Sequence, residues 1–126
     1  MEYMLLIYAA PGRAPAQEAT EEERAAIFAE YGKFTQKAQD AGVLVASDPL
    51  QPPHTATTVR GGDGETLTTD GPFAETKEWL GGYYKLDVES IDEAIEWASQ
   101  IPAVRYGGAI EVRPVMPVPA DYPSSS

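Results

Sequence analysis

Hydrophobic positions along the chain follow two different spacings. Short apolar runs predict β-strands at residues 1–9, 43–46, 80–88 and 109–115. Two longer segments place apolar residues on one helical face, as the stripes Ile27, Tyr31, Phe34, Ala38 and Ile91, Ala94, Ile95, Ala98. The pattern therefore predicts two helices, one on each side of the middle of the chain.

The helix ends carry their own signals. Thr20 with Glu23, and Ser90 with Glu93, form capping boxes in which a side-chain oxygen accepts the hydrogen bond of a free helix amide. Gly42 is placed to stop the first helix, which is predicted over 21–41, and a proline at 102 closes the second.

The strands differ in how they present their side chains. Residues 1–9 are apolar on both faces, so this strand needs cover on both sides, and a second subunit is the expected cover for one of them. In the strand at 80–88, the even positions Tyr84, Leu86 and Val88 are predicted to face the core. Gly81-Gly82 marks either a bulge or a place where something approaches the strand backbone closely.

The middle of the chain has turn chemistry. Residues 48–54 are interpreted as a rigid connector, and runs at 55–60 and 65–69 predict a hairpin with a flexible tip that delivers the chain to Asp70. Pro11–Gln17 is predicted to be a loop. One domain is expected over residues 1–116, followed by a Pro- and Ser-rich tail at 117–126. The element order predicts a ferredoxin-like α+β sandwich, βαβ, hairpin, βαβ, with an antiparallel sheet and both helices on one face.

Composition excludes several classes of function. The 126 residues carry a net charge of −11, which disfavours direct binding to nucleic acids or anionic membranes. There is no cysteine and only one histidine, so no set of metal-binding residues is predicted. No cofactor-binding loop is predicted either. No signal peptide or membrane span is expected from the short apolar start, and we expect a cytoplasmic protein.

The segment after the hairpin carries a family resemblance. Asp70-Gly71-Pro72-Phe73, followed by Glu75, Lys77, Glu78 and Gly81-Gly82-Tyr83, is similar to the signature of the DGPF proteins, a branch of the bacterial YCII-related family. Residues 57–60 and 111–114 extend the similarity. The resemblance implies a dimeric α+β barrel and hence a homodimer. It implies no definite reaction, because members mostly lack an assigned activity.

Candidate catalytic residues are few. Asp70 is either a turn cap or a general base, and the sequence leaves both open. His54, the one histidine, and the hydroxyl of Tyr83 are the candidate proton donors. The resemblance implies a histidine on the first helix paired with an Asp, but residues 21–41 contain no histidine.

Candidate substrate-binding residues are two arginines and two aromatic residues. Arg60 and Arg113 suit either an anion clamp or a salt bridge to Glu75, Glu78 or Glu111. Phe73 and Tyr31 belong to an aromatic cluster that favours a lined pocket.

Two functional hypotheses follow. The first is a protein that binds a small organic molecule, with cofactor-free proton transfer, isomerisation or elimination, as the chemistry if it is an enzyme. Elimination is what the resemblance of one YCII branch to chlorohydroquinone dehydrochlorinases allows. The second is a non-catalytic regulatory protein that partners an alternative sigma factor, as DGPF proteins are thought to do.

Overall fold

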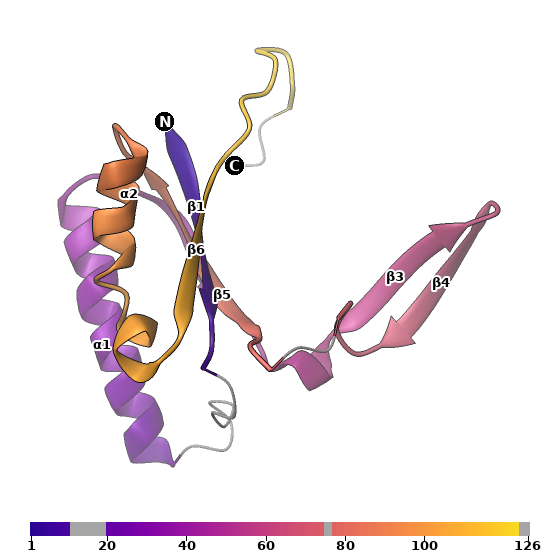
Figure 1. Cartoon of the computed structure of the whole chain (residues 1–126), viewed down its shortest axis with the longest axis horizontal. Coiled ribbons are helices and arrows are strands. Elements are labelled where there is room, and N and C mark those ends of the chain that lie inside the picture. Colours follow the sequence, from indigo (N-terminus) through magenta and orange to yellow (C-terminus); the bar gives the residue numbers. More distant parts are fainter. Residues whose placement is uncertain (11–19, 75–76, 124–126) are drawn as a thin grey trace.

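A four-stranded antiparallel sheet with two helices on one face forms the body of the protein (Figure 1). The computed structural model describes residues 1–10, 20–74 and 77–123, so the predicted loop at 11–17, Glu75 and the last residues of the tail lie outside the described residues. In chain order the main elements are β1 Glu2–Tyr8, α1 Glu21–Asp40, β2 Leu44–Pro49, β3 Thr57–Gly62, β4 Glu65–Asp70, β5 Leu80–Asp87, α2 Ile91–Ala98 and β6 Ala109–Pro114.

The strand order β2-β5-β1-β6, with every neighbouring pair antiparallel, is that of a ferredoxin-like α+β fold. The predicted fold class is therefore confirmed. Short 3₁₀ turns at Pro53–Thr55 and Pro102–Tyr106 complete the described elements. None of the helices in the described part of the chain is long and apolar enough to span a bilayer.

Both predicted N-caps are present, although Glu23 reaches back to the hydroxyl of Thr20 and Glu93 to the amide of Glu89 instead of to the N-cap amides. The amide of Glu23 donates to Oγ1 of Thr20 at 3.1 Å, and the amide of Glu93 donates to Oγ of Ser90 at 3.2 Å. These bonds satisfy amides that the first turn of a helix leaves without a partner.

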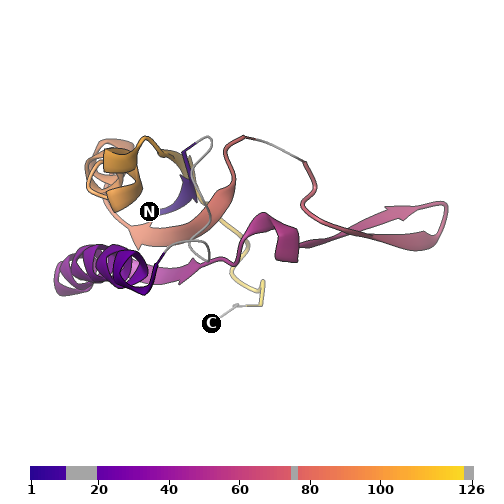
Figure 2. The same ribbon diagram turned by 90° about the horizontal axis from the view of Figure 1, so that it is seen from below.

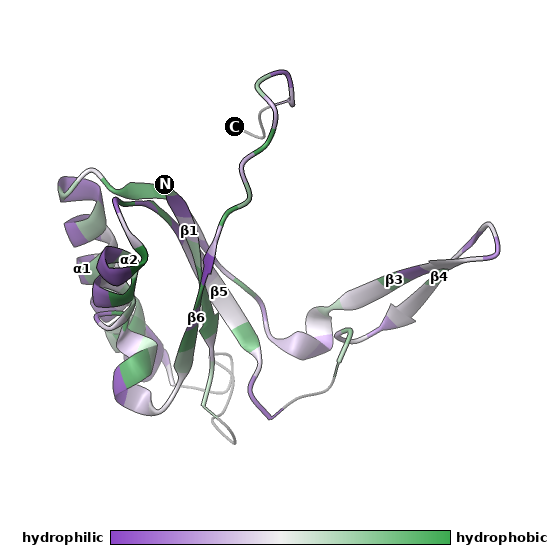
Figure 3. Ribbon diagram, turned by 45° about the horizontal axis from the view of Figure 1, so that its top comes forward, coloured by the Kyte–Doolittle hydropathy of each residue, from purple (hydrophilic) through white to green (hydrophobic). Residues whose placement is uncertain are grey.

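The core lies between the helices and the sheet. Leu5 of β1, Leu86 of β5 and Ile101 after α2 are fully buried, and Tyr84 and Val88 face the core as predicted. Figure 3 shows strong hydrophobic colour on strands of this sheet, whereas the hairpin is mostly pale or purple.

The predicted apolar stripe of the second helix is only half right. Ala94 and Ala98 are buried, but Ile91 and Ile95 are 41% and 52% exposed. Trp97 packs inward instead, with its ring 6.0 Å from that of Phe34 in an edge-to-face contact. A large indole one position along the helix turns the buried face away from the two isoleucines.

The second strand is longer than its sequence predicts. The predicted strand ended at Ala46 and gave way to a connector, but β2 continues through Asp48 to Pro49. A register shift between Leu44 and Ala46 marks a bulge. Proline is tolerated here because β2 is an edge strand, where its missing N–H breaks no ladder.

The glycine pair on β5 matches both predictions made for it. The pairing of β1 with β5 shifts register between Ile7 and Tyr8, opposite this pair. A Cβ on Gly82 would lie 2.9 Å from the carbonyl oxygen of Asp48, so the β2 backbone does approach closely.

The β3–β4 hairpin stands away from the sheet, on the side opposite the helices (Figures 1 and 2). Its tip is a two-residue turn, Asp63-Gly64, with φ of 48° and 78°. Positive φ at both positions matches the twist of a tight hairpin. The chain returns from it through Gly71, whose amide donates to the carbonyl of Ala56 at 2.7 Å.

Candidate functional site

A cavity of about 710 Å³ lies between α1 and the β2–β5 edge of the sheet. Rings and aliphatic side chains make up most of its wall, among them Phe28, Tyr31, Trp79 and Tyr84. Three glycines line the cavity, Gly81 and Gly82 on β5 and Gly32 on α1, and a Cβ on Gly32 would meet nothing within 4 Å.

Tyr31, Thr35 and Tyr84 form a polar cluster on the wall of this cavity, to which Tyr31 contributes its main-chain carbonyl. Oγ1 of Thr35 donates to the carbonyl of Tyr31 at 2.8 Å and lies 2.7 Å from the hydroxyl of Tyr84. The single proton of Thr35 is used by the carbonyl, so the Tyr84 hydroxyl is the donor in the second bond.

Burial keeps both phenols of this cluster protonated. Desolvation, reinforced by the neighbouring Tyr84, raises the pKa of Tyr31 to about 12. Desolvation likewise raises the pKa of Tyr84. Both side chains are therefore neutral over the physiological range. The proton of Tyr84 is used by Thr35, so Tyr84 can accept a hydrogen bond from a bound molecule, whereas the phenol of Tyr31 can donate one.

A second polar pair lies at the cavity wall on β2 and β5. The hydroxyl of Tyr83 donates to Oδ2 of Asp48 at 2.7 Å, and this bond raises the pKa of Tyr83. Glu23 is the other carboxylate that lines the cavity, and no Lys, Arg or His does so among the described residues.

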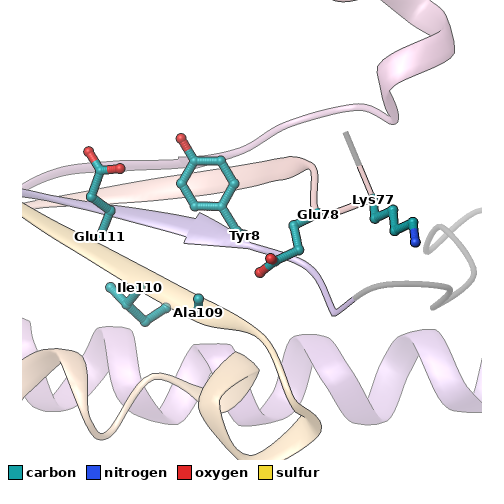
Figure 4. A pocket seen from close by; sticks show the side chains of 6 residues that line it. All are labelled: Tyr8, Lys77, Glu78, Ala109, Ile110 and Glu111. Carbon is teal, nitrogen blue, oxygen red and sulfur yellow. The ribbon is translucent and has the colours of Figure 1, made fainter. Parts of the chain in front are cut away.

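A smaller hollow of about 420 Å³ lies at the other side of the sheet, beside β1 and β6. Its lining is Tyr8, Lys77, Glu78, Ala109, Ile110 and Glu111 (Figure 4). Tyr8 and Glu111 point away from the helices in this view. Glu111 forms an ion pair with Arg113 on the same strand.

The structure places the predicted site residues in separate regions. Tyr31 and Tyr83 line the large cavity. Arg113 forms the salt bridge to Glu111 that was one of its two predicted roles. Asp70 and His54 are exposed and do not line the cavity.

The remaining two predicted residues meet beside the hairpin. The guanidinium of Arg60 lies over the ring of Phe73 at 4.6 Å, a cation–π contact that the sequence did not predict. The catalytic and binding roles assigned to these seven residues stay predictions, since one chain does not gather them in one place.

The sequence did not predict that three residues would place polar groups on the cavity wall. Asp48 was hidden because it was assigned to a connector, and Thr35 because it lies beside the apolar stripe of α1. Tyr84 was correctly predicted as a core residue, but its hydroxyl faces Thr35. The sequence signal for Thr35 is its place four residues after Tyr31, about one helical turn along the same face.

The described residues contain no group of three or more side chains able to hold a metal ion. The site is thus defined by a helix, a sheet edge and aromatic hydroxyls, in an α+β protein of ferredoxin-like topology.

Comparison with known proteins assigns the family. The profile of the YCII-related domain matches residues 1–119. An uncharacterized protein of Rhizobium meliloti (strain 1021) is 36% identical over 126 residues, which is 98% of this chain and 100% of that protein. The chain belongs to the YCII-related family. Its finer placement among the DGPF proteins stays a prediction from the signature.

Proposed function

We propose that this protein binds a small organic molecule in the cavity between α1 and the β2–β5 edge. The observation that carries the proposal is the cavity itself, about 710 Å³ with an aromatic wall and the Tyr31–Thr35–Tyr84 cluster. Ligand sites of roughly 300–1,000 Å³ with mostly apolar walls and a few convergent polar groups are the usual form of small-molecule sites.

The charge of the lining favours a neutral ligand. Glu23 and Asp48 are the ionisable carboxylates on the described wall, without a basic residue there to offset them. An anionic ligand would meet these carboxylates in a partly desolvated space. A ring compound with a hydroxyl or carbonyl group suits the protonated phenols better.

If a proton is transferred in this cavity, the carboxylate of Asp48 would act as the general base. Asp48 lines the cavity and holds the Tyr83 hydroxyl, whereas Asp70 lies at the end of the hairpin. Partnership with an alternative sigma factor stays a prediction, supported by the resemblance and by the net charge of −11.

The test uses a matched pair of probes, neutral 1-naphthol and anionic 1-naphthoate. Trp79 lines the cavity while Trp97 packs on Phe34, so we expect naphthol to change the fluorescence of Trp79 and naphthoate to bind at least tenfold more weakly. A Trp79→Phe variant should lose the signal.

The cavity can be filled from α1 without disturbing the core. A Cβ on Gly32 meets nothing within 4 Å, so Gly32→Leu places a side chain in the cavity, and Lys33→Leu at the exposed neighbouring position is the control. We expect Gly32→Leu to weaken naphthol binding at least tenfold and Lys33→Leu to leave it unchanged. If the two variants bind naphthol equally well, the cavity is not the binding site.

A further inference from the structure

The cavity between α1 and the β2–β5 edge is elongated along the helix. Ile27 and Gln39 both line it, and they lie about 18 Å apart along α1 at a rise of about 1.5 Å per residue. A single fused ring system fills only part of this length. The two ends of the cavity can therefore hold different parts of one ligand.

α1 runs along β5 from the start of the strand towards its end. Thr35 is hydrogen-bonded to Tyr84. Val43, just beyond the helix, accepts a hydrogen bond from the amide of Asp87, the last residue of β5. The first half of α1 therefore lies beside the start of β5, at Gly81, and the second half lies beside Tyr84.

The end of the cavity at the start of β5 is apolar. Phe28 of α1 and Leu50 after β2 line it and are 57% and 46% exposed. The amide of Leu50 donates to the carbonyl of Gly81, and a Cβ on Gly81 would lie 3.5 Å from the ring of Trp79. Exposed apolar side chains around one hollow favour an apolar ligand body, because covering them removes apolar surface from water.

The end of the cavity beside Tyr84 carries uncharged polar groups. Thr35 and Gln39 of α1 and Ser47 of β2 line it. Ser47 lies opposite Tyr84 in the ladder between β2 and β5. The Ser47 hydroxyl and the Gln39 amide can each donate and accept hydrogen bonds, while the Tyr84 hydroxyl can accept one.

The charges on the wall narrow the choice of head group. Glu23 belongs to the first turn of α1, away from the polar end. Asp48 neighbours Ser47, and its Oδ2 already accepts the hydroxyl of Tyr83. An anionic head would meet no basic side chain on the described wall. An ammonium group has donors only, so it cannot accept from the amide of Gln39, whereas a hydroxyl can both donate and accept.

On the basis that this cavity binds a small organic molecule, we propose that its ligand is uncharged and amphipathic. An aromatic body lies at the Phe28 and Trp79 end, and a head group with several hydroxyls, of the sugar class, lies at the Tyr84 end. Gln39 and Ser47 bind the head group and do not contact the body. They therefore decide which head group is accepted.

The test uses three probes with one ring system and different head groups: 1-naphthol, 1-naphthyl β-D-glucoside and the cation 1-naphthylmethylamine. Isothermal titration calorimetry measures the affinity of each. We expect the glucoside to bind at least tenfold more tightly than naphthol, because its hydroxyls gain several hydrogen bonds. The amine should bind no more tightly than naphthol.

A double variant locates the head group. Gln39→Ala with Ser47→Ala should weaken glucoside binding at least tenfold and change naphthol binding less than twofold. Gln100→Ala with Ser99→Ala makes the same two changes at the end of α2, outside the cavity lining, and should leave both affinities unchanged. Circular dichroism of each variant confirms that it is folded.

The possible results separate the head group from the cavity. If none of the three probes binds, both the proposed function and the hydroxylated head group are wrong. If naphthol binds but the glucoside binds no more tightly, or the amine binds more tightly than the glucoside, the head group is wrong and the cavity is still the site. A glucoside advantage that persists in the Gln39→Ala and Ser47→Ala double variant would overturn the role of these two residues.

Discussion

Gly82 is the position at which one added carbon should disturb the fold most clearly. A Cβ there would lie 2.9 Å from the carbonyl oxygen of Asp48 and 3.2 Å from Cα of Pro49. Both contacts are to the backbone of β2, which cannot turn aside as a side chain can. The two strands must therefore separate by about half an ångström or bend, a form of overpacking.

The expected loss of stability follows from a comparison with the neighbouring glycine. Overpacking a well-packed site costs about 1–3 kcal/mol. A Cβ on Gly81 would meet its nearest atom, in the ring of Trp79, at an ordinary 3.5 Å. Replacing either glycine by alanine restricts the unfolded chain equally, an effect of about 0.4–1 kcal/mol. We expect Gly82→Ala to be about 1–3 kcal/mol less stable than Gly81→Ala.

Urea unfolding followed by far-UV circular dichroism measures this difference, because the signal does not depend on Trp79. All variants are compared at one protein concentration, since self-association would add to the apparent stability. If Gly82→Ala unfolds within about 0.5 kcal/mol of Gly81→Ala, β2 does not lie against β5 as described and the account of this edge is wrong.

Two further predictions concern the cavity wall. Thr35→Val leaves the hydroxyl of Tyr84 without its partner, while the carbonyl of Tyr31 keeps its helical amide. We therefore expect a loss of about 1–3 kcal/mol in urea unfolding, with Thr35→Ser retaining most of the stability. Because burial raises the pKa of Tyr31 from 10.0 to about 12, the folded chain holds this proton more tightly than the unfolded chain. The stability that this buried phenol contributes is complete below pH 10 and is lost as the pH rises towards 12. Tyr31→Phe lacks the ionisable group, so its free energy of unfolding should fall less between these pH values than that of the wild type. An equal fall in both proteins would contradict the burial of this phenol.

Local rules predicted most of the fold. The N-caps and the alternation of Tyr84, Leu86 and Val88 depend on neighbours in sequence, and the structure confirms them. The stripe of α2 was wrong at Ile91 and Ile95, because helical spacing alone does not say which side of a mixed stripe meets the sheet. That choice was made by the contact of Trp97 with Phe34.

The site was less predictable, because it depends on contacts between distant segments. Between Thr35 and Tyr84 the chain runs through the end of α1, β2 and the whole hairpin, and no local motif connects the two residues. Asp48 was missed because the predicted strand ended at Ala46 and the proline-rich residues 48–54 were assigned to a connector, although an edge strand can hold a proline. The signature was predicted to contain the site because its ionisable residues are dense in sequence. Much of the signature, however, lies at the base of the hairpin.

The order in which the sheet is assembled has a consequence during synthesis. Leu5 of β1 pairs with Tyr84 of β5 and with Val112 of β6, so the central strand is made first and is completed last. β1 leaves the ribosome long before β5 and β6 have been synthesised. Until then, the backbone hydrogen-bonding groups on both edges of this apolar strand have no strand to pair with. Contacts of such long sequence separation slow folding, and we expect this chain to reach its native state only after its last strand has left the ribosome, under the protection of chaperones.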